Sequence, residues 1–452
     1  MSEFESNFPQ YWEKINLFEI CQPKQWKVIP KSALSDSGHP VYGANGVIGY
    51  YHEYSHEKPT IMIGCRGSCG GVIMSQLRSY INGNSMALDN LAEEFISINF
   101  LYRLLQGRGF KDVITGSSQP QITQENLKKI QIGLPPLNEQ TRIAQKIDEL
   151  LAQVDTLKAR IDAIPALLKR FRQSVLAAAV SGRLTEEWRE SNSVSESTEE
   201  YLVRVIQRRR QTPIVKFKEP VSPDLEKREV EAPQGWIVAS VSHFAECLDS
   251  MRVPVKKELR NGGEGKYPYF GANGEVDRVD EYIFDDDLVL VTEDETFYGR
   301  EKPIAYKYSG KCWVNNHVHA LRAHDSVARD YLCYALMHYD VIPWLTGTTG
   351  RAKLTQGALL SLPIQVPPYQ EQTEIVRRVE QLFAFADQLE AKVASAKSRI
   401  DLLTQSILAK AFRGELVPQN PDDEPASMLL ERIKAQRAAA PKAKRGRKVS
   451  PL

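Results

Sequence analysis

The sequence predicts an α+β protein with an internal repeat, in which two globular segments are joined by two long helices. The main observation is that residues 135–143 return nearly unchanged as 367–375, and residues 174–179 return as 406–411, at one offset (367 − 135 = 406 − 174 = 232). A repeat that keeps one register over this distance indicates two similar units held at a fixed separation.

A second observation is that the offset drifts in the segments before each Pro-Pro pair. Trp26 aligns with Trp236 (236 − 26 = 210), whereas the Gly-Ala-Asn-Gly turn at 43–46 aligns with 271–274 (271 − 43 = 228). Loops absorb insertions, but a helix that must keep its length and its apolar face cannot. We therefore expect the globular segments to differ between the copies and the helices to match.

The apolar residues of the helical segments are spaced alternately three and four apart, which is the pattern of a heptad seam. In the first copy they are Ile147, Leu150, Val154, Leu157, Ile161, Ile164, Leu168, Phe171 and Val175. Their counterparts in the second copy are Val379, Leu382, Ala386, Leu389, Val393, Ala396, Ile400, Leu403 and Ile407. The pattern predicts a coiled-coil pair in which each helix is the partner of the other.

The sequence also marks the ends of both helices. A Pro-Pro pair precedes each helix, Asn138 or Gln370 opens it, and Gly182 or Gly414 closes it. A helix of ~43 residues would reach roughly 65 Å. Pro165 is expected to break or kink the first helix only, because its counterpart in the second copy is a lysine.

Composition limits the class of protein. The 452 residues have a net charge of +1 and are 42% hydrophobic, which is enough for several cores. No run of about 18 apolar residues could span a membrane, and Met1 to Gln22 lacks the pattern of a signal peptide, so a cytoplasmic location is expected. The six cysteines form no CxxC pair and are expected to be reduced. Basic residues cluster at 208–210 and 442–448.

Residues 26–133 and 236–365 each combine strand-forming runs, glycine-rich turns and one helical stretch, which predicts two α+β domains. Each has a late loop of glycine and small hydroxyl residues, at 116–121 and at 347–353. Such loops let backbone N–H groups approach an anion, and the second loop adds an arginine and a lysine that suit a phosphate. A plain turn is the alternative interpretation of both loops.

Together these motifs resemble the specificity subunit of type I DNA restriction–modification enzymes. The resemblance is carried by the repeated (Leu/Val)-Pro-Pro-x-x-Glu-Gln-Thr-x-Ile, the Gly-Ala-Asn-Gly turn, the late Gly-(Ser/Thr)-(Ser/Thr) loop and the whole of segment 168–185. It covers nearly the whole chain, and the central segment looks closest to the enteric IA branch.

The resemblance implies two target-recognition domains, each reading one half of a bipartite site in double-stranded DNA, joined by two antiparallel helices that act as a ruler. The chain itself would be non-catalytic and would bind no cofactor. Two methylation subunits would dock on it and use S-adenosylmethionine to methylate adenine at N6. Restriction subunits would add translocation and cleavage that depend on ATP and Mg.

This interpretation divides the chain into six parts. They are a first target-recognition domain (1–136), a central spacer helix (137–182), a helical and charged linker (183–232), a second target-recognition domain (233–368), a C-terminal spacer helix (369–414) and a tail that is partly helical and then basic and disordered (415–452).

The residues themselves do not predict catalysis by this chain. Residues 366–369 come near the Asp/Asn-Pro-Pro-Tyr motif of N6-adenine methyltransferases, but Val366 has no oxygen to hold the target amino group, and 134–137 keep even less of the motif. Neither Gly265-Lys266 nor Gly310-Lys311 has the upstream glycine and the following hydroxyl of a phosphate-binding loop.

The predicted DNA contacts lie on the turns and loops. They are Tyr42, Asn45, Arg66, Ser68, Ser117, Ser118, Gln119 and Gln121 in the first copy, and Asn273, Arg300, Asn315, Asn316, His317, Thr348, Thr349, Arg351 and Lys353 in the second. Arginines are candidates for guanine edges, and Asn and Gln for adenine edges. The predicted spacer and docking residues are Glu139, Gln140, Leu150, Leu157, Glu371, Gln372, Leu382 and Leu389. No metal site is predicted.

Two other functions remain open at this point. One is the specificity subunit of a type IIB-like restriction–modification enzyme, which the neighbouring genes would distinguish. The other is a coiled-coil scaffold with two protein-binding heads, whose deletion would leave adenine methylation of the genome unchanged. The sequence does not name the bases of a target, because readout also depends on loop placement and DNA shape.

Overall fold

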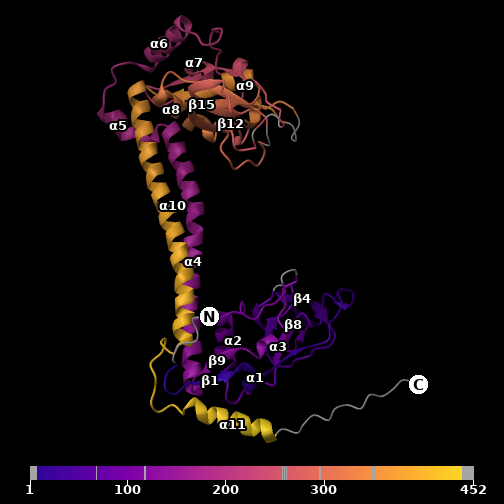
Figure 1. Cartoon of the computed structure of the whole chain (residues 1–452). Helices are drawn as coiled ribbons and strands as arrows, with labels where there is room; N and C mark the ends of the chain where they lie inside the picture. The colour runs from indigo at the N-terminus through magenta and orange to yellow at the C-terminus, as the bar shows by residue number, and fades with distance from the viewer. Residues whose placement is uncertain are drawn as a thin grey trace, which may run out of the picture. The chain divides into compact units, whose positions relative to one another are not determined.

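The structure is a computed structural model that describes residues 8–439 except 68, 117–118, 257, 259, 261, 295–296 and 348–351. Its described residues form two compact units (Figure 1). Unit 1 combines residues 8–162 with 394–439, and unit 2 consists of residues 163–393. Among the helices described, none is long and apolar enough to cross a membrane.

Unit 1 is built on three small sheets, with strand orders β1-β9, β2-β8-β5-β6 and β4-β3-β7 among its described residues. The strands are β1 (Glu13–Asn16), β2 (Gln22–Gln25), β3 (His39–Gly43), β4 (Gly46–Tyr51), β5 (Ile61–Gly64), β6 (Val72–Met74), β7 (Tyr80–Ile81), β8 (Ser85–Asp89) and β9 (Gln131–Leu134). The helices are α1 (Leu17–Ile20), η1 (Lys31–Ala33), α2 (Ile98–Arg108), α3 (Gln124–Leu127) and α11 (Ala426–Ala439).

Unit 2 repeats this order of elements, with strand orders β10-β17 and β11-β16-β14-β15-β12-β13 among its described residues. Its strands are β10 (Ile237–Ser240), β11 (Glu246–Cys247), β12 (Tyr267–Gly271), β13 (Gly274–Val279), β14 (Phe284–Thr292), β15 (Ala305–Val314), β16 (Val318–Arg322) and β17 (Pro363–Val366). Its helices are η2 (Arg183–Thr185), α5 (Glu186–Ser191), α6 (Thr198–Gln211), α7 (Val241–Phe244), η3 (Asp249–Met251), α8 (Ser326–Met337), η5 (Ile342–Trp344) and α9 (Gln356–Ser361).

The first strand of each unit corrects one alignment drawn from the sequence. Trp12 directly precedes β1, which pairs antiparallel with β9, and Trp236 directly precedes β10, which pairs antiparallel with β17. The counterpart of Trp236 is therefore Trp12 and not Trp26. The side chain of Trp26 serves another purpose, because its indole N–H donates to Asp89 Oδ2 at 3.2 Å.

The two predicted long helices are present as α4 (Leu137–Val180) and α10 (Tyr369–Phe412), of 44 residues each. Both begin one residue before the expected opening residue. Helix α4 continues through Pro165, so the expected break is wrong. Proline removes one backbone donor and crowds the carbonyl four residues earlier. This local cost of about 3 kcal/mol is outweighed by the remainder of a helix of 44 residues.

Helices α4 and α10 contact each other in both units. In unit 1, Lys158 Nζ lies 3.8 Å from Asp401 Oδ1, and Lys397 Nζ lies 2.6 Å from Asp162 Oδ1. In unit 2, Arg172 Nη2 lies 2.5 Å from Asp387 Oδ1. The residue numbers rise along α4 as they fall along α10, so the contacting stretches run in opposite directions.

The predicted seam is only partly buried. Val154, Ile400 and Ile407 form one apolar cluster in unit 1 with the partly buried Leu150 and Ile161. Two seam residues of unit 1 remain open to solvent, since Leu157 is 46% and Leu403 45% exposed. In unit 2, Leu382 and Leu389 are half-buried. The heptad pattern therefore identifies the contacting face but overstates how much of it is covered.

Glycines end both long helices for a steric reason. Gly182 and Gly414 have φ of 74° and 76°, in the left-handed region that disfavours other residues. A Cβ on Gly182 would also lie 2.8 Å from Pro233 Cγ, and one on Gly414 would lie 2.9 Å from Pro9 Cδ. The end of α10 therefore contacts the residues just before β1 in unit 1. The end of α4 contacts the residues just before β10 in unit 2.

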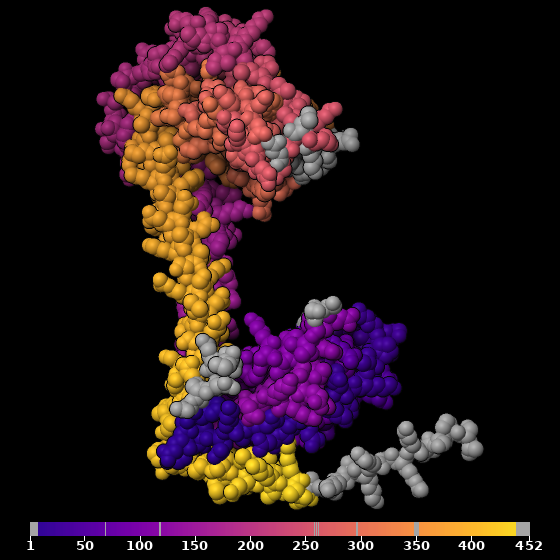
Figure 2. Space-filling model, in the orientation of Figure 1, coloured from indigo at the N-terminus to yellow at the C-terminus, as the bar shows by residue number. Residues whose placement is uncertain are grey.

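Helix α11 extends the repeat into the segment that the sequence suggested was a tail. It packs on α1 in unit 1, and its Arg437 donates to the Phe18 carbonyl at 2.6 Å. In unit 2, α6 packs on α7, and Arg209 donates to the Ser242 carbonyl at 2.8 Å. Figure 2 shows the yellow α11 lying against the indigo N-terminal residues. Residues 415–439 are thus part of the first globular unit.

Substituting Ile433 with alanine should destabilise unit 1. Ile433 is 0% exposed in the core of that unit, so truncation removes apolar contacts and leaves a cavity, at a cost of about 2–4 kcal/mol. Hydrogen exchange measures the effect, because amides of α2 report on unit 1 and amides of α8 on unit 2.

The matched control is Met428→Ala on the same helix, where the side chain is 43% exposed. It should leave the exchange of both helices nearly unchanged. Equal effects of the two substitutions would show that α11 is not packed in the core of unit 1.

Candidate nucleic-acid interface

The end of strand β14 joins three of the predicted DNA-facing segments of unit 2. The N–H of Glu293 donates to the His317 carbonyl at 3.1 Å, and its carbonyl accepts from the Leu354 N–H at 2.8 Å. The Thr292 hydroxyl donates to the carbonyl of Ala272, in the Gly-Ala-Asn-Gly turn, at 2.8 Å. The turn, the loop between β15 and β16, and the loop before α9 therefore meet in one place.

The Glu293 side chain binds two cations although the residue is only 6% exposed. Its Oε1 lies 2.7 Å from Lys353 Nζ, and its Oε2 lies 2.5 Å from Arg252 Nη1. Burial opposes ionisation, but the bonds from Lys353 and Arg252 outweigh it, so the pKa of the Glu293 carboxyl is lowered. These charge-assisted bonds tie the loop at Lys353 to the segment that follows η3.

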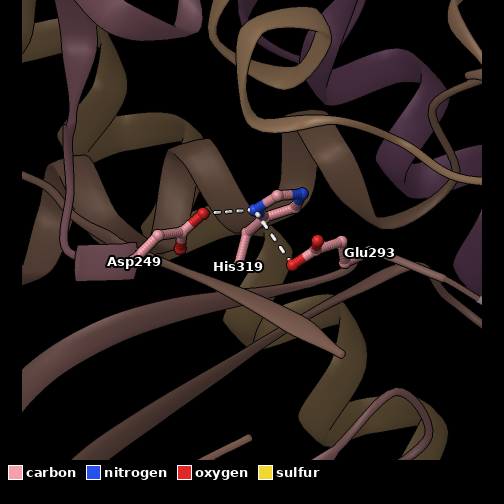
Figure 3. A group of neighbouring side chains, drawn as sticks. All are labelled: Asp249, Glu293 and His319. Carbon is pink, nitrogen blue, oxygen red and sulfur yellow. Dashed lines mark hydrogen bonds and ion pairs between the residues drawn. The ribbon is translucent and has the colours of Figure 1, made fainter. Parts of the chain in front are cut away.

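His319 lies between two carboxylates at the base of the same loops, as Figure 3 shows. Its Nδ1 is 2.5 Å from Asp249 Oδ2, and its Nε2 is 2.7 Å from the Leu354 carbonyl. Both ring nitrogens therefore lie within hydrogen-bond distance of an oxygen atom. Burial raises the pKa of the Asp249 carboxyl, but bonding to His319 and the charge of Arg252 more than offset it, and the pKa is lowered.

The residues Asp249, Arg252, Glu293, His319 and Lys353 form what we call the ionic cluster. Two carboxylates and a histidine are metal-ligand types, and their nearest atoms lie within 4.8 Å of one another. However, Arg252 and Lys353 already bind the carboxylate oxygens. A metal ion would have to displace two positive side chains, so the geometry fits an ionic lock between loops better than a metal centre.

Unit 1 has the same backbone arrangement without the charges. The N–H of Cys65 donates to the Asn84 carbonyl at 2.9 Å, and the Cys65 carbonyl accepts from the Ile122 N–H at 3.0 Å. The Gln25 side chain donates to Cys65 Sγ at 2.9 Å. Burial raises the pKa of the Cys65 thiol, so the group is neutral.

The strand registers show which residues correspond. Gln25 pairs with Met86 between β2 and β8, and these elements match β11 with η3 and β16 in unit 2. Gln25, Cys65 and Met86 therefore take the places of Asp249, Glu293 and His319. The two units share the backbone hydrogen bonds that join their loops, which we call the frame of loops. They differ in the side chains that support it, which are neutral in unit 1 and charged in unit 2.

Most of the predicted DNA contacts of unit 1 that the structure describes are exposed. They are Asn45, Arg66, Gln119 and Gln121. The backbones of Arg66 and Gln121 form a β-bridge, so their two loops lie side by side. Tyr42 is corrected, because it is 5% exposed and its hydroxyl accepts from the Gln76 N–H at 3.2 Å. It supports a neighbouring loop instead of facing a ligand.

In unit 2, Asn273, Asn316 and His317 are exposed. His317 Nδ1 lies 2.6 Å from Asp294 Oδ1. Arg300 is half-buried, and its guanidinium donates to the Lys302 and Pro303 carbonyls, both at 3.1 Å. Its guanidinium therefore stabilises the loop that contains it.

Asn315 is also corrected as a surface contact, because it is only 7% exposed. Its counterpart Asn82 is buried too, and the Asn82 side-chain oxygen accepts from the Ile29 N–H at 3.1 Å. Both are positions inside a turn. The remaining predicted contacts lie outside the residues that the structure describes; they are Ser68, Ser117, Ser118, Thr348, Thr349 and Arg351.

Two residues of the basic run at 208–210 have partners within unit 2. Arg209 caps carbonyls of α7, as described above, and Arg210 Nη2 lies 2.5 Å from Glu219 Oε1. Arg208 is exposed. The second basic cluster, at 442–448, lies outside the described residues.

Four residues predicted for spacing and docking are buried instead. Glu139, Gln140, Glu371 and Gln372 lie on the long helices as expected, but each is at most 1% exposed. A residue that docks a partner must be accessible, so this part of the prediction is corrected. Both glutamines donate to the carbonyl of the first proline of their Pro-Pro pair, at 3.0 Å in α4 and 2.9 Å in α10.

The glutamates hold each helix to its own unit. Glu371 accepts from the Trp236 indole at 2.8 Å, the Thr185 hydroxyl at 2.7 Å and the Arg189 guanidinium at 3.1 Å. Glu139 accepts from the Gln419 amide at 2.5 Å. Burial raises the pKa of the Glu139 carboxyl, which Gln419 only partly opposes. These partners could not be identified from the sequence, because they are far from the glutamates along the chain.

Comparison with known proteins agrees with this architecture. Residues 9–166 and 233–395 match the type I restriction modification DNA specificity domain. The chain is 29% identical to the EcoDI specificity subunit of Escherichia coli, over 98% of this chain and 99% of the relative. It is 34% identical to the EcoKI specificity subunit of Escherichia coli K12, over 79% and 76% of the two chains.

A solved structure shares the fold. The HsdS subunit of Thermoanaerobacter tengcongensis superposes with a TM-score of 0.53 at 18% identity, over 92% of this chain and all of the other. The resemblance found in the sequence is confirmed by these matches. The chain belongs to the family of type I restriction–modification specificity subunits.

Proposed function

We propose that each unit of this chain reads one half of a bipartite DNA site. The observation that supports this is the shared frame of loops at the ends of β5 and β14, on which the two units carry different side chains. Exposed Arg, Asn and Gln side chains on these loops suit the edges of guanine and adenine. The residues that support these loops are neutral in unit 1 and charged in unit 2. This difference favours two different half-sites.

The long helices α4 and α10 set the spacing between the half-sites in this proposal. Their equal lengths and opposite directions support a paired coiled-coil spacer, in which a change of length would move one recognition unit relative to the other. The chain contributes no catalytic step of its own. Methylation subunits bring S-adenosylmethionine, and restriction subunits bring the ATP- and Mg-dependent steps.

Exposed apolar residues on the helices are the candidates for docking the methylation subunits. Monomeric proteins leave few large apolar side chains together on a helix surface. In unit 1, Leu157, Leu402 and Leu403 are 46%, 64% and 45% exposed, and in unit 2, Leu167 and Phe385 are 58% and 55% exposed. These side chains replace the buried Glu-Gln pairs as the proposed docking surface.

Exchanging the recognition elements of unit 1 should change half of the target. Residues 17–130, between β1 and β9, would be replaced by the matching segment of a relative with a different methylation sequence. Methylome sequencing should then show one altered half-site, because the frame of unit 2 is untouched. The reciprocal exchange in unit 2 is the control, and a change in both halves from either exchange would refute the proposal.

Shortening both helices should shorten the gap between the half-sites. Deleting residues 155–161 of α4 together with 398–404 of α10 removes one heptad from each of two facing stretches. Seven residues span about 10.5 Å, which corresponds to roughly three base pairs at 3.4 Å each.

Methylome sequencing again measures the result. The half-sites should stay the same while the unspecified gap loses roughly three base pairs. Deleting the heptad from α4 alone shifts the seam without a matching change in α10, so this control should abolish methylation. An unchanged gap in the double deletion would rule out a spacer role.

A further inference from the structure

Two cationic side chains at the described loops of unit 2, Lys353 and Arg252, are already paired with carboxylates. Lys353 and Arg252 bind Glu293, Arg252 also lies 3.2 Å from Asp249 Oδ2, and His317 binds Asp294. A protein that holds DNA by its phosphates needs free positive charge on the side that faces the backbone. In the ionic cluster, these positive charges are instead neutralised by carboxylates of the same unit.

Lys353 is the informative member of the cluster. Its side chain is 47% exposed, so it stands at the surface of the proposed interface, whereas the Glu293 side chain is 8% exposed. A buried carboxylate that holds an exposed lysine fixes where the ammonium group lies. At the matching bridge of unit 1, Gln121 takes the place of Lys353 and Arg66 the place of Asp294. The bridge therefore carries a net positive charge in unit 1, whereas the two charges cancel in unit 2.

We infer that Glu293 is a specificity-determining residue of unit 2, because its carboxylate withholds the exposed Lys353 from DNA phosphates. Contacts to phosphates strengthen binding to every sequence equally, whereas contacts to base edges discriminate. Neutralising Lys353 keeps non-specific binding low, so the half-site of unit 2 is selected by contacts from its loops to base edges. This inference rests on the proposed function.

The test is Glu293→Gln in the full chain, purified with the subunits that copurify with it. The amide keeps the size of the side chain but releases Lys353, which is then free to reach a phosphate. Each added phosphate contact steepens the dependence of log affinity on log salt by about 0.9, so affinity should fall about threefold more than for the unaltered chain between 50 and 200 mM salt.

Three duplexes separate the possible outcomes. They carry the methylated site, the site with the half read by unit 2 scrambled, and the site with the half read by unit 1 scrambled. Glu293→Gln should raise affinity for the duplex scrambled in unit 2's half by severalfold, and so reduce discrimination at that half. Discrimination at the other half should not change.

Two variants control for charge and for folding. Glu301→Gln removes the same charge from an exposed residue of unit 2 that pairs with Lys169, and it should leave the salt dependence as it was. Adding Lys353→Met to Glu293→Gln should restore the shallower salt dependence, which loss of structure would not do.

An unchanged salt dependence in Glu293→Gln would overturn the inference, as would equal loss of discrimination at both halves. Failure of the proposed function looks different, because the unaltered complex would then bind all three duplexes equally. If the Glu293→Gln chain fails to fold, Lys353→Met alone is the decisive variant. It should not change the salt dependence, because Glu293 already neutralises Lys353 in the unaltered chain. A shallower dependence in Lys353→Met would refute the inference.

Discussion

A buried glutamate at the start of each long helix is the interaction on which the arrangement of the chain depends. In unit 2, Glu371 accepts hydrogen bonds from Trp236 before the first strand, and from Thr185 and Arg189 beyond the end of α4. One carboxylate therefore joins the start of one helix, the end of the other and the sheet that follows. Loss of a partner would leave a buried charge unsatisfied, which is costly.

Unit 1 builds the same joint from different segments. Glu139 binds Gln419, and Arg142 beside it forms an ion pair with Asp423 at 2.6 Å. Both partners come from the chain that follows α10, and so the C-terminal segment completes the first unit. Residues that follow α10 therefore complete unit 1, just as residues that follow α4 complete unit 2. The globular parts can differ between the units while these contacts hold the helices in place.

Local signals explain why the helices and the repeat could be predicted. A heptad pattern and a Pro-Pro pair act over a few residues, and both copies carry them. The sequence contains a weak sign that α11 corresponds to α6. Leu202, Arg204 and Arg209 recur 228 residues later as Leu430, Arg432 and Arg437, and Val205 is matched by the similar Ile433 (430 − 202 = 228). Four matching positions within a helix of 14 residues are too few to identify a repeat from the sequence alone.

The ionic cluster could not be predicted from the sequence. Asp249, Glu293 and His319 belong to different elements, and only the pairing of β16 with β14 and β11 brings them together. For the same reason, Tyr42 and Asn315 were expected on the surface because they lie in turn-rich segments, while the packing of those turns buries them. Residue type and local pattern indicate which loops matter, but side-chain direction depends on tertiary contacts.

The central claim is that two units on one chain read two halves of one DNA site. Methylome sequencing of a host with and without this gene tests it most directly. The account predicts that N6-methyladenine disappears from a single bipartite sequence, with one methylated adenine in each half and a gap of fixed length between them. Methylation that is unchanged, or that is lost from one continuous sequence, would contradict it.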